Sequence, residues 1–280
     1  MKCLIPSQDL LNALSKLLSV VDKKNTRPIL AYTQINVINN QMELIATDLE
    51  VSTKVIIPVV VENVGSFCVN AKNLYDIVKE IPDGDLSIQI KENQNLLNLN
   101  YKDIYFSLVI FNKDEFPQIH FAKAVDKQCF NLKSSILAGL INKTVYAISQ
   151  DDSRIYLNGV YLQEVKSRLR AVATDGHRLS LIETNIENSN DSHKALSAGI
   201  IIPRKGILEL KKMAELVSED MLYVSVDESF IQVFKDNYFL SIRLISREYP
   251  KYQAVIPNKT SFLITANKDV LFNAIKRIKI

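Results

Sequence analysis

The sequence predicts an α+β fold made of a repeated domain, with antiparallel sheets and two helices in each copy. Composition is the first support, because 280 residues that are 47% apolar and 23% charged can bury more than one domain core. Internal similarity at a long period is the second. The third is a series of alternating apolar segments separated by short polar turns, which favours antiparallel pairing.

The internal similarity consists of three blocks that recur in the same order. The first offset is 127 residues and the other two offsets are 133 residues, so the matches stay nearly in register. One such match is expected by chance, but three in register indicate a duplicated domain. The paired blocks are 46–49 with 173–176, 69–77 with 202–210, and 115–117 with 248–250.

The first copy can be followed element by element. Residues 3–5 predict a strand, and 10–18 predict an amphipathic helix because Leu10, Leu14 and Leu17 fall on one face. Asn39 and Asn40 are a turn signal between two alternating strands. The remaining expected elements are strands over 34–37, 42–46 and 51–61, a helix near 73–80, and strands over 86–90, 96–100 and 104–110.

Two further starts of the same pattern follow. A strand at 129–131 and a helix at 136–145 begin the second copy, whose second helix is expected near 206–217. A strand at 262–264 and a helix at 270–278 begin a third copy, which then stops without the sheet that would bury its helix. We therefore expect domains over 1–122 and 123–257, and a truncated third domain over 258–280, from a fragment or a naturally shortened chain.

The charge and the segment composition exclude several classes of protein. Residues 1–122 carry 11 Lys and Arg against 14 Asp and Glu, so no strongly basic domain is present and any DNA contact is confined to selected faces. No apolar run approaches the roughly 20 residues of a membrane span, and the N-terminus lacks a signal peptide. Three widely spaced cysteines are typical of a reducing cytoplasm.

A search for catalytic chemistry favours a protein without an active site, metal or cofactor. The three histidines lack metal-ligand spacing, and no nucleotide-binding or hydrolase motif occurs. Asp151 and Asp152 could bind magnesium, although a solvated turn is the simpler interpretation. Asp48 and Asp175 stand at matching repeat positions and are predicted to cap their own turns. The alternative function is a metal-dependent DNA- or nucleotide-processing enzyme that uses Asp48, Asp175 and His177.

The segment 174–179, Thr-Asp-Gly-His-Arg-Leu, has two interpretations. Asp-Gly between two apolar strands predicts a tight turn. His177 and Arg178 follow that turn without an obvious partner, and surface loops on a rigid sheet often carry binding residues. From the residues alone, recognition and structure both remain open for this pair.

The segment 173–179 resembles the signature of the second domain of the bacterial sliding clamp, the β subunit of DNA polymerase III. Further matches to that family extend over the whole chain in the family's order. They are 46–50 (Ala-Thr-Asp-Leu-Glu), 116–117 (Phe-Pro), 154–159 (Arg-Ile-Tyr-Leu-Asn-Gly), 202–206 (Ile-Pro-Arg-Lys-Gly) and 249–252 (Tyr-Pro-Lys-Tyr).

The resemblance implies a non-catalytic processivity factor that encircles double-stranded DNA without reading its sequence. In that family the sheets form the outer wall of a ring, and two helices per domain face a central hole. The complete subunit forms a head-to-tail homodimer. The implied partners are the polymerase III catalytic subunit, the clamp loader, and other polymerases and repair proteins with clamp-binding peptides. The implied location is the cytoplasm, at the nucleoid.

The resemblance also implies a hydrophobic groove that binds client peptides between the second and third domains. An apolar floor with a few polar groups suits a short linear peptide. Ala254 departs from the family, because many relatives have Arg at that position. The matching groove residues are Arg154, Tyr156, Leu157, Thr174, Gly176, His177, Arg178, Leu179, Pro250 and Val255.

A second set of residues is expected to face DNA. Lys72 and Lys79 are seven apart, hence on one helix face, and the matching helix of the second copy is also basic. Scattered cations bind phosphates without reading bases, which permits sliding, although solvated helix faces look the same in sequence. Lys24 and Tyr156 join the set through the resemblance alone. The set is Lys24, Lys72, Lys79, Tyr156, Arg204, Lys205, Lys211 and Lys212.

Overall fold

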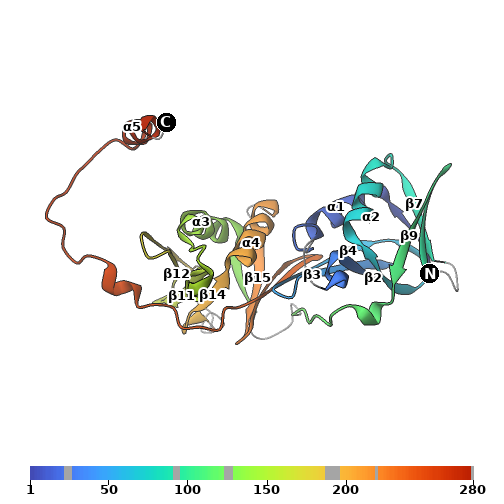
Figure 1. Ribbon diagram of the computed structural model, residues 1–280, viewed down its shortest axis with the longest axis horizontal. Helices are drawn as coiled ribbons and strands as arrows, with labels where there is room; N and C mark the ends of the chain where they lie inside the picture. Colours follow the sequence, from blue (N-terminus) through green and yellow to red (C-terminus); the bar gives the residue numbers. More distant parts are fainter. Residues whose placement is uncertain (22–26, 91–94, 123–128, 187–195, 218–219, 279–280) are drawn as a thin grey trace. The chain divides into compact units, whose positions relative to one another are not determined.

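The computed structural model of the chain describes residues 1–21, 27–90, 95–122, 129–186, 196–217 and 220–278 (Figure 1). It divides into two compact units, Met1–Glu248 and Tyr249–Ile280, which are described separately below. Within the described residues, no helix has the length and apolar character needed to cross a membrane.

The first repeat begins with the predicted strand and helix and continues as antiparallel strands interrupted by a second helix. Its elements are β1 (Lys2–Pro6), α1 (Ser7–Leu17), the 3₁₀ helix η1 (Pro28–Ala31), β2 (Tyr32–Ile38), β3 (Gln41–Thr47), β4 (Val51–Pro58), β5 (Val60–Asn63), β6 (Gly65–Asn70), α2 (Ala71–Glu80), β7 (Asp85–Ile90), β8 (Leu96–Tyr101), β9 (Ile104–Phe111) and η2 (Lys113–Glu115).

Apart from β5, which has no counterpart among the described residues, the second repeat follows the same order of strands and helices. Its elements are β10 (Cys129–Lys133), α3 (Ser134–Thr144), η3 (Val145–Ala147), η4 (Asp152–Leu157), β11 (Gly159–Val165), β12 (Arg168–Thr174), β13 (Leu179–Asn185), β14 (Ile200–Pro203), α4 (Arg204–Leu216), β15 (Met221–Val226), β16 (Phe230–Lys235) and β17 (Tyr238–Arg243).

The pairing of strands repeats as well, and every pair is antiparallel as predicted. In the first repeat β2 pairs with β3 and β6, while β3 pairs with β4. In the second repeat β11 pairs with β12 and β14, while β12 pairs with β13. The remaining strands form the orders β1-β7-β8-β9 and β10-β15-β16-β17. The duplication inferred from the sequence blocks is therefore confirmed in the fold.

The helices form where the apolar spacing predicts them, and α1–α4 pack on one face of the sheets (Figure 1). Leu10, Leu14 and Leu17 of α1 are fully buried, so one stripe of the helix faces the core. Helix α2 starts at Asn70, whose side-chain oxygen accepts a hydrogen bond from the Asn73 backbone at 3.0 Å. Packing of two helices against a sheet gives each repeat a two-layer architecture.

Strand β17 of the second repeat pairs with β4 of the first, which joins the repeats edge to edge. The register sets Tyr238 opposite Val55 and Ile242 opposite Val51. Because of this pairing, strands from both repeats belong to one continuous sheet with 13 described strands. Backbone hydrogen bonds across two repeats restrict their relative motion more than a flexible linker would.

Two predicted strands differ in the structure. The strand expected over 51–61 is divided at Val59, because Pro58 lacks a donor and the segment changes partners: β4 pairs with β3, and β5 pairs with β1. Residues 262–264 are not a strand, since no described strand offers them hydrogen bonds, and Leu263 is 92% exposed.

The second unit contains little packed structure of its own. The 3₁₀ helix η6 (Tyr252–Val255) follows Tyr249, and the rings of Tyr249 and Tyr252 meet edge to face with centroids 6.3 Å apart. Helix α5 (Lys268–Ile278) forms as predicted but has no buried residue. Its apolar residues Leu271, Phe272 and Ile275 are each more than half exposed.

Candidate functional site

The two repeats each contain a Thr-Asp turn with matching hydrogen bonds. Asp48 Oδ1 accepts from the backbone nitrogens of Glu50 and Val51 at 3.0 and 2.7 Å. Asp175 Oδ1 accepts from those of His177 and Arg178 at 2.9 and 3.0 Å. The prediction that both aspartates cap their own turns is therefore confirmed. No group of three His, Cys, Asp or Glu that could hold a metal gathers within the described ranges.

The third residue of each turn adopts a left-handed conformation. Gly176 has φ of 91°, and a Cβ there would lie 2.8 Å from Nη1 of Arg154. Leu49 occupies the same place in the first repeat with φ of 77°, a conformation that is strained for a residue with a side chain. The second turn therefore favours glycine mainly for its left-handed backbone, since the Arg154 guanidinium is the flexible end of a side chain and could shift to make room.

Leu49→Gly is expected to stabilise the protein by about 1 kcal/mol, because the strain of a left-handed leucine exceeds the added chain entropy of glycine. Urea unfolding of the variant measures this gain. Leu181→Gly is the matched control, since Leu181 is similarly exposed at 36% but lies in β13 with an ordinary backbone. That variant is expected to lose stability, and a loss in both would show that Leu49 is unstrained.

The expected groove residues numbered below 180 come from two neighbouring segments of the second repeat. Arg154, Tyr156 and Leu157 lie on η4. The others lie in the turn between β12 and β13 or, for Thr174 and Leu179, at the strand ends that flank it. The Arg154 guanidinium lies against Gly176, so the two segments meet at that point. Leu157 is buried, whereas the side chains of His177 and Arg178 are exposed.

Electrostatics hold both arginines of this site. Arg154 Nε donates to Asp151 Oδ2 at 2.8 Å, and Arg178 Nε donates to Asp175 Oδ2 at 3.0 Å. The backbone N–H groups of Arg178 and then His177 lower the pKa of Asp175 to about 2. Both aspartates are therefore ionised at neutral pH.

Two exposed apolar residues of this surface escaped the sequence analysis. Tyr146 is 57% exposed, and the guanidinium of Arg178 lies over its ring at 5.7 Å from the centroid. Ile155 is 52% exposed on η4. Neither residue has a sequence signal, because exposure of one apolar side chain depends on the packing of its neighbours.

The other expected groove residues, Pro250 and Val255, lie in the second unit. The Pro250 carbonyl accepts a hydrogen bond from the Tyr252 backbone at 2.7 Å. Val255 ends η6 and is 71% exposed. Ala254, the departure from the family, lies in the same short helix and is also exposed.

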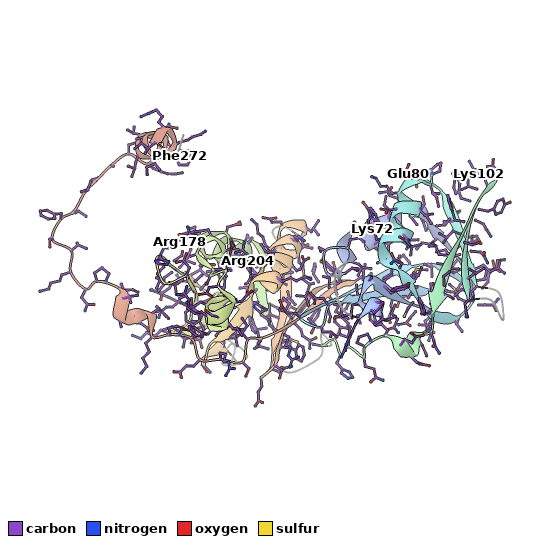
Figure 2. The ribbon with its side chains drawn as sticks, in the orientation of Figure 1. Lys72, Glu80, Lys102, Arg178, Arg204 and Phe272 are labelled. Atoms are coloured by element: carbon purple, nitrogen blue, oxygen red, sulfur yellow. The ribbon has the colours of Figure 1, made fainter. Side chains whose placement is uncertain are left out.

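The described cations expected to face DNA lie on α2 and α4, whereas Tyr156 lies on η4, and Figure 2 shows the side chains of Lys72 and Arg204. Lys72 forms an ion pair with Asp76, one turn along α2, while Lys79 is exposed. Arg204 is the first residue of α4. Lys24 lies outside the described residues.

The remaining lysines of α4 have acidic partners. Lys211 pairs with Glu215 at 3.7 Å, and Lys212 pairs with Glu209 at 2.7 Å. Lys205 reaches the first repeat, where its ammonium contacts the Asp48 carboxylate and lies 3.4 Å from the Val20 carbonyl oxygen. These pairings reduce the positive field of α4, and they use Lys205 to join the repeats.

Two repeated α+β domains that share a sheet define a clamp-type protein, and comparisons with known proteins agree. Residues 1–120 match the N-terminal domain, and 131–251 the central domain, of the DNA polymerase III beta subunit. The chain is 31% identical to the beta sliding clamp of Pseudomonas putida over 279 residues, which is 99% of this chain and 73% of that protein.

Solved structures give the same result. A crystal structure of the Pseudomonas aeruginosa DNA polymerase III subunit beta matches with a TM-score of 0.90 and 27% identity, over 99% of this chain and 74% of that one. The Caulobacter crescentus sliding clamp matches with a TM-score of 0.90 and 30% identity over the same shares. The chain belongs to the beta sliding clamp family of DNA polymerase III.

Proposed function

We propose that this protein is a non-catalytic sliding clamp that carries client proteins along duplex DNA through a peptide-binding groove. The observation that carries the proposal is the meeting of η4 with the Thr-Asp-Gly turn. There Arg154 lies against Gly176, which directly precedes the exposed His177 and Arg178, and the 3₁₀ helix of Arg154 also carries the buried Leu157. Directed polar groups around apolar side chains suit a short peptide.

Complexes of relatives show that clamps of this family bind small ligands. The Pseudomonas aeruginosa clamp has been solved bound to griselimycin, and the Caulobacter crescentus clamp with polyethylene glycol at a proposed beta-motif tethering region. For this chain we propose Arg154, Tyr156, Leu157, Thr174, Gly176, His177, Arg178, Leu179, Pro250 and Val255 as the groove.

The proposed DNA contacts are sequence-independent. Lys79 and Arg204 are the strongest candidates, since the structure gives neither an acidic partner among the described residues. Lys72 and Lys211 exchange their exposed acidic partners easily in water, so they remain available to phosphates. Lys212 is half exposed but pairs with the buried Glu209, so we rank it below these two. We propose Tyr156 and Lys24 as further contacts, and we place Lys205 last because it joins the repeats.

The assembly follows from the same proposal. The domains extend over 1–122, 123–257 and, as a third start, 258–280. In the complete protein, a head-to-tail homodimer encloses DNA, and its helices face the hole. The partners are the polymerase III catalytic subunit, the clamp loader, and other polymerases and repair proteins with clamp-binding peptides. The protein acts in the cytoplasm at the nucleoid, without a cofactor.

Leu179→Asp is expected to weaken client binding at least about 10-fold, because a carboxylate would replace an apolar side chain of the groove. Fluorescence anisotropy with a labelled peptide from the clamp-binding segment of the polymerase III catalytic subunit measures the dissociation constant. Leu181→Asp is the matched control, two residues further on the same face of β13 and outside the proposed groove. Equal losses in both variants, or no binding by the wild type, would contradict the proposed groove.

A further inference from the structure

The two arginines of the proposed groove are held by the same local arrangement. In each case an aspartate three residues earlier accepts from Nε of the arginine, at 2.8 Å for Asp151 with Arg154 and 3.0 Å for Asp175 with Arg178. Asp151 precedes η4, and Asp175 lies in the turn after β12. The spacing Asp-x-x-Arg therefore occurs twice at one surface.

Backbone hydrogen bonds fix each carboxylate before it meets the guanidinium. Asp151 Oδ1 accepts from the Ser153 backbone at 3.0 Å and from the Ser153 hydroxyl at 2.6 Å. Asp175 Oδ1 accepts from the backbone of His177 and Arg178. One oxygen is thus used by the turn, and the other is aimed at the arginine.

Attachment through Nε leaves the outer edge of each guanidinium available. A guanidinium has five N–H groups, and four of them are on the two Nη nitrogens. In the part of the chain that the structure describes, these Nη nitrogens form no further hydrogen bond or ion pair. Nη1 of Arg154 points to Gly176, and the guanidinium of Arg178 lies over the Tyr146 ring. Figure 2 shows Arg178 on the second repeat.

We propose that Asp151 and Asp175 are positioning residues of the groove, each holding an arginine side-on so that its Nη donors face the oxygens of a docked peptide. This inference rests on the proposed function. Its physical reason is pre-organisation: a long side chain that is already ordered loses less freedom on binding. A neighbouring aspartate without this geometry, Asp152, serves as a comparison, because it makes no such contact with either arginine.

The charge state of both aspartates fits this role. Hydrogen bonds from the Ser153 side chain and backbone, and then from Arg154, lower the pKa of Asp151. The backbone N–H groups of the second turn lower that of Asp175. Both carboxylates therefore keep their negative charge at the pH of the cytoplasm, and the arginines stay anchored whether or not a peptide is bound.

A double-mutant cycle separates positioning from simple turn stability. Asp151→Asn keeps an oxygen for the Ser153 backbone but loses the charge that holds Arg154. We expect Asp151→Asn to weaken binding of the labelled polymerase peptide about 5-fold and Arg154→Ala about 10-fold. The double variant should bind no more weakly than Arg154→Ala, because the aspartate acts through the arginine. The pair Asp175→Asn and Arg178→Ala is expected to behave alike.

Two controls make the outcome decisive. Asp152→Asn should leave affinity unchanged, and Asp76→Asn should do the same, since it breaks an ion pair with Lys72 away from the groove. Additive losses in the double variants would overturn the positioning role. Equal losses for Asp152→Asn would overturn it as well, because charge near the site rather than geometry would then be responsible.

A second measurement does not depend on the peptide. The arginine Nε–H signals in a ¹⁵N NMR spectrum report whether each side chain is anchored. We expect protected signals for Arg154 and Arg178, and loss of the Arg154 signal alone in Asp151→Asn at an unchanged unfolding temperature. Rapidly exchanging signals in the wild type would overturn the inference. Protected signals without any peptide binding would instead show that the proposed function fails, and the positioning role with it.

Discussion

Gly159→Ala is expected to destabilise the protein by about 3 kcal/mol and lower its unfolding midpoint by about 6–10 °C. Gly159 opens β11 opposite β14, where it faces Pro203 in the register. A Cβ at this position would lie 2.3 Å from the carbonyl oxygen of Ile202 and 2.9 Å from its carbon. These are backbone atoms of a paired strand, so no side chain can turn away to make room.

The matched control changes another glycine to alanine, and there the expected change in stability has the opposite sign. Gly139 lies inside α3, and nothing stands within 4 Å of a Cβ built there. Gly139→Ala is therefore expected to stabilise the protein by about 0.5–1 kcal/mol, as alanine does in a helix interior. Thermal unfolding of both variants measures the contrast. A tolerated Gly159→Ala would show that β14 moves away easily.

The close approach of β14 also explains why the segment 154–159 ends in glycine. The residues before it form η4, which carries Arg154 and Tyr156, and β11 begins directly after them. Close approach of β14 fixes the start of β11, and so fixes where η4 ends. The glycine thus helps to fix the position of η4, which carries three residues of the proposed groove.

The duplicated turn was the part of the site most open to prediction from sequence. Thr47 and Thr174 each accept from the backbone two residues later, as Asp48 and Asp175 each cap the backbone that follows. Such bonds are local, and short-range residue chemistry dictates them. The same locality explains the correct helices at 7–17 and 71–80, whose apolar spacing was visible in the sequence.

Long-range contacts could not be predicted, because they depend on the pairing of distant strands and not on local residue chemistry. Lys205 matches Lys72 in the repeat, and both lie at the starts of equivalent helices. Lys72 pairs within its own helix, whereas Lys205 pairs with an aspartate 157 residues away. The sequence pattern is the same in both, and only the edge pairing of β4 with β17 brings Asp48 within reach.

Asp48→Ala is expected to cost about 2–3 kcal/mol, because this carboxylate has two separate functions. One oxygen caps the turn between β3 and β4, and the other binds the Lys205 ammonium of the second repeat. The Asp48 side chain is only 8% exposed, so its partners are poorly replaced by water. Lys205 is 37% exposed, which limits the cost of leaving its charge unpaired. Urea unfolding measures the loss.

Asp175→Ala separates the two functions of Asp48, because it removes the equivalent cap but no contact between repeats. A larger loss for Asp48→Ala is therefore expected. The difference is a lower bound on the contribution of the junction, because Asp175→Ala also breaks the exposed ion pair with Arg178. Lys205→Met tests the same contact from the other side, since it leaves the turn intact, and its effect should not add to that of Asp48→Ala. Equal losses in the two aspartate variants would mean that the Asp48–Lys205 ion pair adds nothing to the junction between the repeats. A junction held by the ion pair as well should instead unfold together with both repeats in a single transition, and Asp48→Ala should broaden that transition.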